Sequence, residues 1–244
     1  MRIIKLHATE STNSFLKGFV KQSHYNEEVA LIANKQTAGR GQMASTWLSE
    51  EDKSLTVSIF KKINNIDISQ QFYLSMRIAL SLKKVMESYR MPDVFVKWPN
   101  DIMSGNLKIG GILIENCIVG KKWIGSVIGI GLNVNNETFV GLPKASSIKL
   151  LTDNEVSIEA LSEEIISQIN SDFLSFTPQN FSSLKKAYET ALFKRDVVSH
   201  FKDLKTQQKF NGIIKGVTDT GLLEVETEND QIRHYNLKEV KLYF

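Results

Sequence analysis

Apolar and polar residues follow two kinds of spacing along the chain, one typical of helices and the other of strands. In residues 69–89 and 161–176, apolar side chains return every three or four positions. Both segments are therefore expected to form helices with one buried face. Two further helices are predicted, from about residue 13 to 22 and over 181–193.

Short apolar runs that end at turn-forming residues predict the strands. In the first part of the chain they cover 2–7, 29–33, 55–60, 94–97, 109–118 and 123–133, and the segment 141–154 is expected to be a connecting loop. Beyond Arg195 the runs are shorter and closer together, at 197–198, 210–217, 222–227, 232–235 and 240–243. This spacing favours a small β-barrel of about 50 residues after a larger domain that mixes helices and strands.

Composition narrows the class of protein only moderately. The chain has 244 residues, of which 42% are hydrophobic and 23% charged, as in ordinary globular proteins. A net charge of +3 permits a polyanionic or acidic partner without requiring one. Its single cysteine, Cys117, excludes an intrachain disulfide. Because the chain shows neither a signal-peptide pattern nor a run of about 18 apolar residues, no membrane association is expected and the simplest location is cytoplasmic.

Residues 97–115 combine groups that suit an anionic ligand better than a core. A strand-like run stops before Pro99, and the pair Asn100-Asp101 predicts a turn, because both side chains bond local backbone. Lys108 precedes Gly110-Gly111, and glycines inside a strand indicate a bulge or a close approach of another group. A cation, an amide, a carboxylate and an uncovered backbone are therefore expected to meet at the ends of two strands.

Residues 34–54 form a long polar segment without helical or strand periodicity, and long loops in compact domains are usually functional or mobile. Its Gly39-Arg40-Gly41 offers backbone N–H groups and a guanidinium to a phosphate, although a plain surface loop fits the composition equally well. The histidines, at 7, 24, 200 and 234, lack metal-ligand spacing, so no metal ligands are assigned. The residues alone predict an α/β enzyme for a phosphate-bearing ligand, with its substrate unidentified.

Taken together, five segments carry a resemblance. They are Ser11-Thr12-Asn13, the loop Gln36-Thr37-Ala38-Gly39-Arg40-Gly41 closed by Trp47, Lys97-Trp98-Pro99-Asn100-Asp101, the run from Lys108 through Gly110-Gly111-Ile112-Leu113 to Glu115, and Gly129-Ile130-Gly131-Leu132-Asn133-Val134-Asn135. Their order resembles the biotin protein ligase family over most of residues 1–140. The C-terminal β region resembles that family's SH3-like domain, with weaker support from the sequence.

The resemblance implies an α+β fold, with a mixed, largely antiparallel sheet flanked by helices as in class II aminoacyl-tRNA synthetases and biotin synthetases. A catalytic domain over 1–193 would be followed by a small SH3-like β-barrel over 194–244. It also implies a two-step reaction with biotin, ATP and Mg²⁺. Biotin would be activated as biotinyl-5'-AMP and then transferred to a lysine of a biotin carboxyl carrier protein or domain.

The same resemblance assigns roles to individual residues. Lys108 and Arg40 would carry the positive charge for the carboxylate and the α-phosphate, and Asp101 with Asn100 would orient the incoming lysine and take its proton. The residues expected to bind biotin are Ser11, Thr12, Asn13, Gln36, Arg40, Gly41, Gln42, Lys108, Gly110 and Gly111. The residues expected to bind ATP are Arg40, Trp47, Lys108 and Asn133.

Two features depart from the family pattern. The run Gln42-Met43-Ala44-Ser45-Thr46 follows Gly41, where family members often carry further arginines or a glycine, and fewer cations should retain the adenylate less firmly. No helix-turn-helix segment precedes the catalytic domain, so DNA is not an expected partner. The sequence is compatible with a monomer and with a homodimer formed at a strand edge.

Two alternatives belong to other classes. A lipoate-type ligase shares the architecture, but the 97–101 segment argues against it, and the ureido ring of biotin matches the polar residues 11–13 and 36. A non-catalytic small-ligand or RNA-binding relative would show a basic surface with aromatic residues. Residues 194–244 instead balance nine basic side chains with eight acidic ones.

Overall fold

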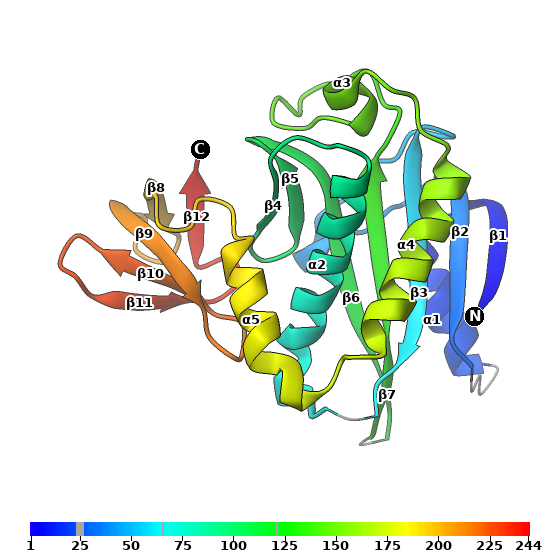
Figure 1. Ribbon diagram of the computed structural model, residues 1–244, viewed down its shortest axis with the longest axis horizontal. Helices are drawn as coiled ribbons and strands as arrows, with labels where there is room; N and C mark the ends of the chain where they lie inside the picture. The colour runs from blue at the N-terminus through cyan, green and yellow to red at the C-terminus, as the bar shows by residue number, and fades with distance from the viewer. Residues whose placement is uncertain (23–26, 65, 121) are drawn as a thin grey trace.

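The computed structural model describes residues 1–22, 27–64, 66–120 and 122–244, so His24 lies outside the described residues. Figure 1 shows a large sheet flanked by helices and a smaller sheet beside it. The large sheet contains β1 (Arg2–Thr9), β2 (Val29–Gln36), β3 (Ser54–Lys62), β4 (Val94–Lys97), β5 (Asp101–Ser104), β6 (Leu107–Val119) and β7 (Lys122–Asn133). The helices are α1 (Thr12–Gln22), α2 (Gln71–Ser88), α3 (Ile148–Thr152), α4 (Ile158–Phe173) and α5 (Phe181–Thr190).

The expected mixed, largely antiparallel sheet is confirmed. Its strand order is β1-β2-β3-β7-β6-β5-β4, and among these described strands β1 and β2 pair in parallel while the other neighbours are antiparallel. The register places Asp101 opposite Gly111 and Gly111 opposite Gly131. Gly131 in turn lies opposite Thr56 of β3. One row across four strands thus carries the carboxylate of the 97–101 segment and two glycines.

The two faces of the large sheet have different coverings. On β7, Ile128 and Ile130 belong to the main buried cluster, which also contains residues of α2, α4 and α5. Because neighbouring residues of a strand point to opposite faces, Gly129 and Gly131 open onto the other side. There α1 packs through Leu16 and its neighbours against a second, smaller cluster. The glycines therefore leave room for other side chains to lie directly on the backbone of the face that carries α1.

The C-terminal strands form a separate antiparallel sheet with the order β11-β10-β9-β8-β12. Its hydrophobic residues, including Phe201 and Leu223, join the same buried cluster as the helices of the large domain. The indole N–H of Trp98 donates to the carbonyl of Gly221 at 2.9 Å, which ties the 97–101 segment to this sheet. The strands are β8 (Val198–Asp203), β9 (Lys209–Val217), β10 (Leu223–Thr227), β11 (Ile232–Tyr235) and β12 (Val240–Tyr243).

Two local expectations were wrong. The turn covers residues 98–100, and Asp101 begins β5, which pairs with both β4 and β6. The segment 141–154 contains the short helix α3, because Ser147 caps it by accepting from the backbone N–H of Leu150 and Ile148 is buried. The division of the chain at residues 193 and 194 stays a prediction.

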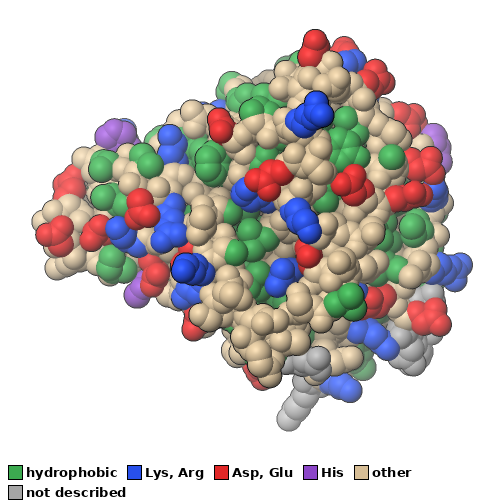
Figure 2. All heavy atoms as spheres, in the orientation of Figure 1, with side chains coloured by type: hydrophobic (Ala, Val, Ile, Leu, Met, Phe, Trp, Pro, Cys, Tyr) green, Lys and Arg blue, Asp and Glu red, His purple; other side chains and the backbone are tan. Residues whose placement is uncertain are grey.

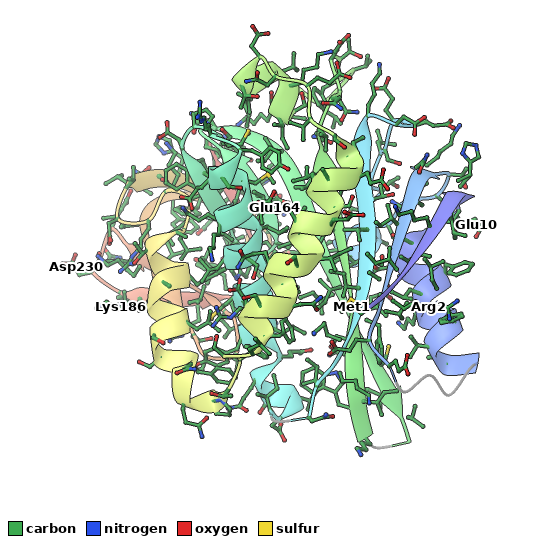
Figure 3. The ribbon with its side chains drawn as sticks, turned by 45° about the vertical axis from the view of Figure 1, so that its right-hand side comes forward. Met1, Arg2, Glu10, Glu164, Lys186 and Asp230 are labelled. Carbon is green, nitrogen blue, oxygen red and sulfur yellow. The ribbon has the colours of Figure 1, made fainter. Side chains whose placement is uncertain are left out.

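The face of the molecule that carries the helices gives little support to a polyanion-binding role (Figure 2). On the face seen in Figure 2, basic and acidic side chains alternate over the helices. Figure 3 shows Glu164 on α4, Lys186 on α5 and Asp230 at the far end of the C-terminal sheet, with Met1 and Arg2 at the start of β1. No helix among the described residues is long and apolar enough to cross a membrane.

Candidate active site

A cavity of about 710 Å³ lies on the α1 side of the large sheet and extends to the C-terminal sheet. Its size is in the usual range for small-molecule sites, roughly 300–1,000 Å³. The walls come from the start of α1, the loop after β2, the strands β5 to β7 and the C-terminal strands. The structure therefore brings together most of the segments that carried the sequence resemblance.

Glycines form the floor of the cavity. A Cβ at Gly129 would lie 2.3 Å from Asn13 Oδ1, and one at Gly131 would lie 2.4 Å from Trp47 Cε2, so both side chains rest directly on the sheet. Gly111 also lines the cavity. Gly110 lies outside it, and a Cβ there would meet the Leu132 side chain at 2.3 Å, so this glycine makes room for a neighbouring strand. The sequence signal for this floor is the pair Gly129 and Gly131, because residues two apart in a strand face the same side of the sheet.

Hydrogen-bonding side chains gather at the end of the cavity near α1. Gln36 Oε1 accepts from the backbone N–H of Thr12 at 2.8 Å and from its hydroxyl at 3.0 Å. Ser58 Oγ lies 2.8 Å from Thr12 Oγ1 and 2.6 Å from Asn13 Oδ1. Ser11 also lines the cavity while its hydroxyl accepts from the N–H of Ser14. Ser58 was not predicted as a site residue because residues 55–60 have the apolar pattern of an ordinary buried strand.

Asp101 and two lysines form the charged part of the site. Its carboxylate lies 2.9 Å from Lys97 Nζ and 2.6 Å from Lys108 Nζ, and its side chain is 15% exposed. Burial raises the pKa of Asp101, but the two ammonium groups outweigh burial and hold that pKa below its ordinary value. The carboxylate is therefore ionised at neutral pH. Asn100 lines the cavity too, but its amide nitrogen donates to the carbonyl of Ile112 at 2.7 Å.

Basic side chains outnumber acidic ones around the cavity. Asp101 is the one acidic side chain among the described residues that line it. The basic lining residues are Arg40, Lys97, Lys108, Lys144, Lys238 and Lys241. Lys238 and Lys241 belong to the C-terminal part of the chain, which no local pattern connected with this site. The site favours an anionic ligand with several negative oxygens.

The loop after β2 covers one side of the cavity. Arg40 donates from Nη1 to Ser14 Oγ at 2.9 Å and from Nη2 to Glu115 at 3.3 Å. Gly41 donates its backbone N–H to the carbonyl of Ser45 at 2.7 Å, and a Cβ at Gly41 would collide with Ser45 Oγ. The loop is therefore folded back on itself and fastened through Arg40.

Two predicted ATP-binding residues lie in different places. Trp47 lines the cavity, and Lys108 Nζ lies 5.8 Å from the centre of its ring. Asn133 is buried beneath the site, where its amide nitrogen donates to the carbonyl of Ser146 at 2.9 Å. It is not among the described residues that line the cavity. Gln42 and Gly41 do line it.

The fold and the cavity together define a small-molecule-binding protein whose site has one hydrogen-bonding end and one cationic end. The family model of the biotin/lipoate A/B protein ligase family matches residues 6–133, more than half of the chain. The chain therefore belongs to the biotin/lipoate A/B protein ligase family. Residues 203–240 match the biotin protein ligase C terminal domain.

Several curated relatives match the chain. It is 25% identical over 220 residues to the bifunctional ligase/repressor BirA of Bacillus subtilis, covering 88% of this chain and 66% of the relative. It is 30% identical over 143 residues to the biotin–[acetyl-CoA-carboxylase] ligase of Mycobacterium tuberculosis, covering 57% and 52%. The chain spans 62% of the similar protein from Bacillus spizizenii. The matched part of the chain thus spans no more than about two thirds of the length of each of these relatives.

Solved structures confirm the fold. The biotin protein ligase of Aquifex aeolicus in complex with biotin and ATP superposes with a TM-score of 0.78 at 24% identity, over 99% of this chain and 98% of that one. The ligase of Leishmania major in complex with biotinyl-5-AMP gives a TM-score of 0.67 at 19% identity, over 96% and 98%. Because both identities are below 25%, these similarities show a shared fold and nothing more specific.

Proposed function

We propose that this protein is a biotin–protein ligase that uses ATP to activate biotin as biotinyl-5'-AMP and then transfers biotin to a lysine of a biotin carboxyl carrier protein or domain. The observation that carries the proposal is the polarity of one continuous cavity. Its α1 end holds neutral hydrogen-bonding groups together with Arg40, which is paired with Glu115, and its other end holds ammonium groups around Asp101. Family membership and ligand-bound structural relatives support it.

The two ends of the cavity fit the two ends of biotin. The ureido ring carries a carbonyl acceptor and two N–H donors, which match Thr12, Asn13 and Gln36 near α1. The carboxylate would then point toward Lys108. As the carboxylate attacks the α-phosphate, negative charge gathers on the phosphoryl oxygens, and fixed cations stabilise such a transition state. Lys108 is placed for this role because it lies beside uncovered backbone at Gly111, 3.7 Å from a Cβ built there.

ATP would bring the metal ion that the reaction needs. Mg²⁺ is usually held by substrate phosphates and one or two carboxylates. Asp101 offers one carboxylate, and no group of three or more acidic, histidine or cysteine side chains is found among the described residues. These residues fit Mg²⁺ that arrives bound to ATP, and Asp101 would be the carboxylate that the cavity could offer it. Trp47 would contact the nucleotide, and Asn133 would support the strand beneath it.

Transfer requires a carrier lysine to attack in its neutral form. Because the pKa of Asp101 is held low by Lys97 and Lys108, its carboxylate accepts a hydrogen bond well but is a weak base. Asp101 would therefore orient the amine more than it would remove the proton. The carrier is proposed to be a biotin carboxyl carrier domain, and the enzyme is proposed to work in the cytoplasm. A strand-edge homodimer is compatible with the exposed edge of the large sheet at β1.

Biotin-dependent exchange of labelled pyrophosphate into ATP tests the proposal. Lipoate serves as the parallel substrate, because it shares the carboxylate chain and lacks the ureido ring. Exchange with biotin alone supports the proposal. Exchange with lipoate alone would keep adenylation but overturn the substrate, and no exchange with either from folded protein and Mg²⁺ would overturn the enzymatic function.

A further inference from the structure

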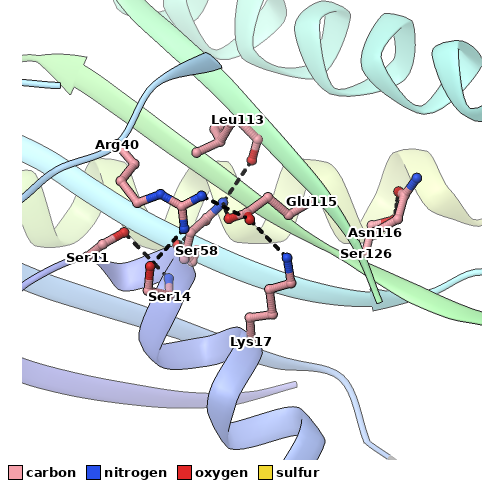
Figure 4. A network of polar contacts seen from close by, with 10 residues as sticks. Ser11, Ser14, Lys17, Arg40, Ser58, Leu113, Glu115, Asn116 and Ser126 are labelled. Carbon is pink, nitrogen blue, oxygen red and sulfur yellow. Dashed lines mark hydrogen bonds and ion pairs between the residues drawn. The ribbon is translucent and has the colours of Figure 1, made fainter. Parts of the chain in front are cut away.

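Glu115 of β6 lies behind the cavity wall and contacts three side chains, of which Arg40 and Asn13 line the cavity. Its carboxylate accepts from Lys17 Nζ at 3.0 Å, from Arg40 Nη2 at 3.3 Å and from Asn13 Nδ2 at 3.2 Å. Figure 4 shows the contacts of Lys17 and Arg40 with Glu115, which join α1, the loop and β6. Glu115 itself is not among the described residues that line the cavity. It therefore acts on a ligand only through its neighbours.

The carboxylate of Glu115 is largely buried and ionised, which suits it to hold Arg40 and Asn13 in place. Its side chain is 13% exposed. Burial raises the pKa of Glu115, but hydrogen bonds from Lys17 and Asn13 and the charges of Lys17 and Arg40 outweigh burial, so the pKa lies below its ordinary value. Glu115 thus remains ionised at neutral pH. A buried carboxylate with charged partners holds those partners in narrow positions, because leaving it unpaired would be costly.

Arg40 is held at both ends of its guanidinium. Nη1 donates to Ser14 on α1 and Nη2 donates to Glu115 on β6. Arg40 also pairs with Thr46 in an isolated bridge, so its position fixes both sides of the loop. The resemblance to the ligase family implied that Arg40 contacts biotin and phosphate. In the structure the guanidinium is already engaged by the protein, which makes it a fastener of the loop as well.

Asn13 is oriented by the same carboxylate. Its Nδ2 donates to Glu115 and to the carbonyl of Leu113 at 3.1 Å, which leaves Oδ1 to accept from Ser58. The amide therefore has one orientation, and the hydroxyl of Ser58 follows it. Through this chain of contacts, Glu115 decides which hydrogen-bonding groups face a ligand at the α1 end of the cavity.

We propose that Glu115 is a positioning residue for carboxylate activation, which fastens the loop through Arg40 and fixes the orientation of the Asn13 amide. This inference rests on the proposed function for its kinetic consequences. The fastening of the loop is independent of any ligand. The two parts can therefore be measured separately.

The first measurement is proteolysis of the loop in the protein without substrates. Chymotrypsin cleavage beside Trp47 is compared in wild type, Glu115→Gln, Arg40→Met and the double variant. We expect each single change to speed cleavage by roughly tenfold, and the double variant to be no faster than either one, because both changes break the same ion pair. Lys17→Met is the matched control, since it removes a cation from Glu115 without touching Arg40, and it should stay within about twofold of wild type.

The second measurement separates KM from kcat in the pyrophosphate exchange. Glu115→Gln should raise KM for biotin by roughly tenfold and change kcat much less, because binding groups are misplaced while Lys108 is untouched. Unchanged cleavage in Glu115→Gln, additive effects in the double variant or an unchanged KM would overturn the inference. If Glu115→Gln fails to fold, Ser14→Ala tests the same guanidinium from its other end and should still speed cleavage. If wild type shows no exchange, the proposed function fails. The cleavage rates of wild type, the two single variants and the double variant still decide whether Glu115 fastens the loop.

Discussion

The ammonium group of Lys238 donates a hydrogen bond to the backbone carbonyl of Met43 at 2.8 Å. Lys238 lies between β11 and β12, and Met43 is at the tip of the loop after β2, 195 residues away along the chain. This contact joins the C-terminal sheet to the loop across the mouth of the cavity. The C-terminal sheet therefore helps to keep the loop in its folded position.

Replacing Lys238 by Met should loosen the tip of the loop and speed the loss of biotinyl-5'-AMP in the absence of an acceptor. A single hydrogen bond of this kind is worth about 0.5–1.5 kcal/mol, so release should increase by about two- to tenfold. The measurement is the release rate of labelled adenylate from preloaded enzyme. Lys205→Met is the control, because Lys205 lies in the turn after β8 of the same domain but pairs with Glu239 at 2.6 Å. Equal release from wild type and Lys238→Met would rule out this tether.

Ala44→Gly should act in the opposite direction. Ala44 has φ of 63° and Met43 has φ of 53°, so two successive residues are in the left-handed region. That conformation costs a non-glycine residue roughly 1–2 kcal/mol, and part of the gain from glycine is lost again to its freedom in the open loop. We expect adenylate release to slow by about two- to threefold.

The matched control for Ala44→Gly is Arg90→Gly. Arg90 is exposed and also has a left-handed backbone, with φ of 57°, but it follows α2 away from the loop. This variant should raise the melting temperature without changing adenylate release. Faster release from Ala44→Gly than from wild type would show that the folded loop seen here is not the retaining state.

Much of the site could be predicted from the sequence because its parts are local motifs at the ends of strands. Lys108 was expected there from its neighbouring glycines and Thr12 and Gln36 from the resemblance to biotin protein ligases, and all three line the cavity. The choice between Gly110 and Gly111 was beyond the sequence, because strand register decides which residue faces the cavity. The contribution of Lys238 depends on how two distant sheets pack, which no periodicity reports.

The glycine floor predicts a severe effect of one added methyl group. A Cβ at Gly131 would overlap the indole of Trp47, which belongs to the loop after β2 and packs on this glycine. Gly131→Ala should therefore displace Trp47 and raise KM for ATP by roughly tenfold or more, because small misplacements of positioning groups are costly. Gly18→Ala is the control, since Gly18 in α1 has nothing within 4 Å of its Cβ position. Alanine is the better helix former there, so that variant should be at least as stable as wild type.

The role of Asp101 predicts different effects on the two half-reactions. Asp101→Asn keeps the shape of the side chain but removes the charge that would orient the incoming amine. Transfer to a carrier lysine should fall by at least about tenfold, while pyrophosphate exchange should fall less. Single-turnover transfer from preformed adenylate measures the first effect. Asp93→Asn is the control, because Asp93 is exposed and asparagine tolerates its φ of 46°. Normal transfer by Asp101→Asn would eliminate the proposed orienting role.

The same variant predicts how stability depends on pH. In the folded protein the pKa of Asp101 lies below its ordinary value of 3.8, because Lys97 and Lys108 favour the carboxylate. A carboxyl group with a lowered folded pKa stabilises the protein above its unfolded pKa and loses that contribution as the pH falls through the folded value. Wild type should therefore be more stable than Asp101→Asn near neutral pH, and the gap should narrow as the pH falls below about 4. Urea unfolding of both proteins between neutral and acidic pH measures the gap, and a constant difference would show that the lysines do not stabilise the ionised carboxylate.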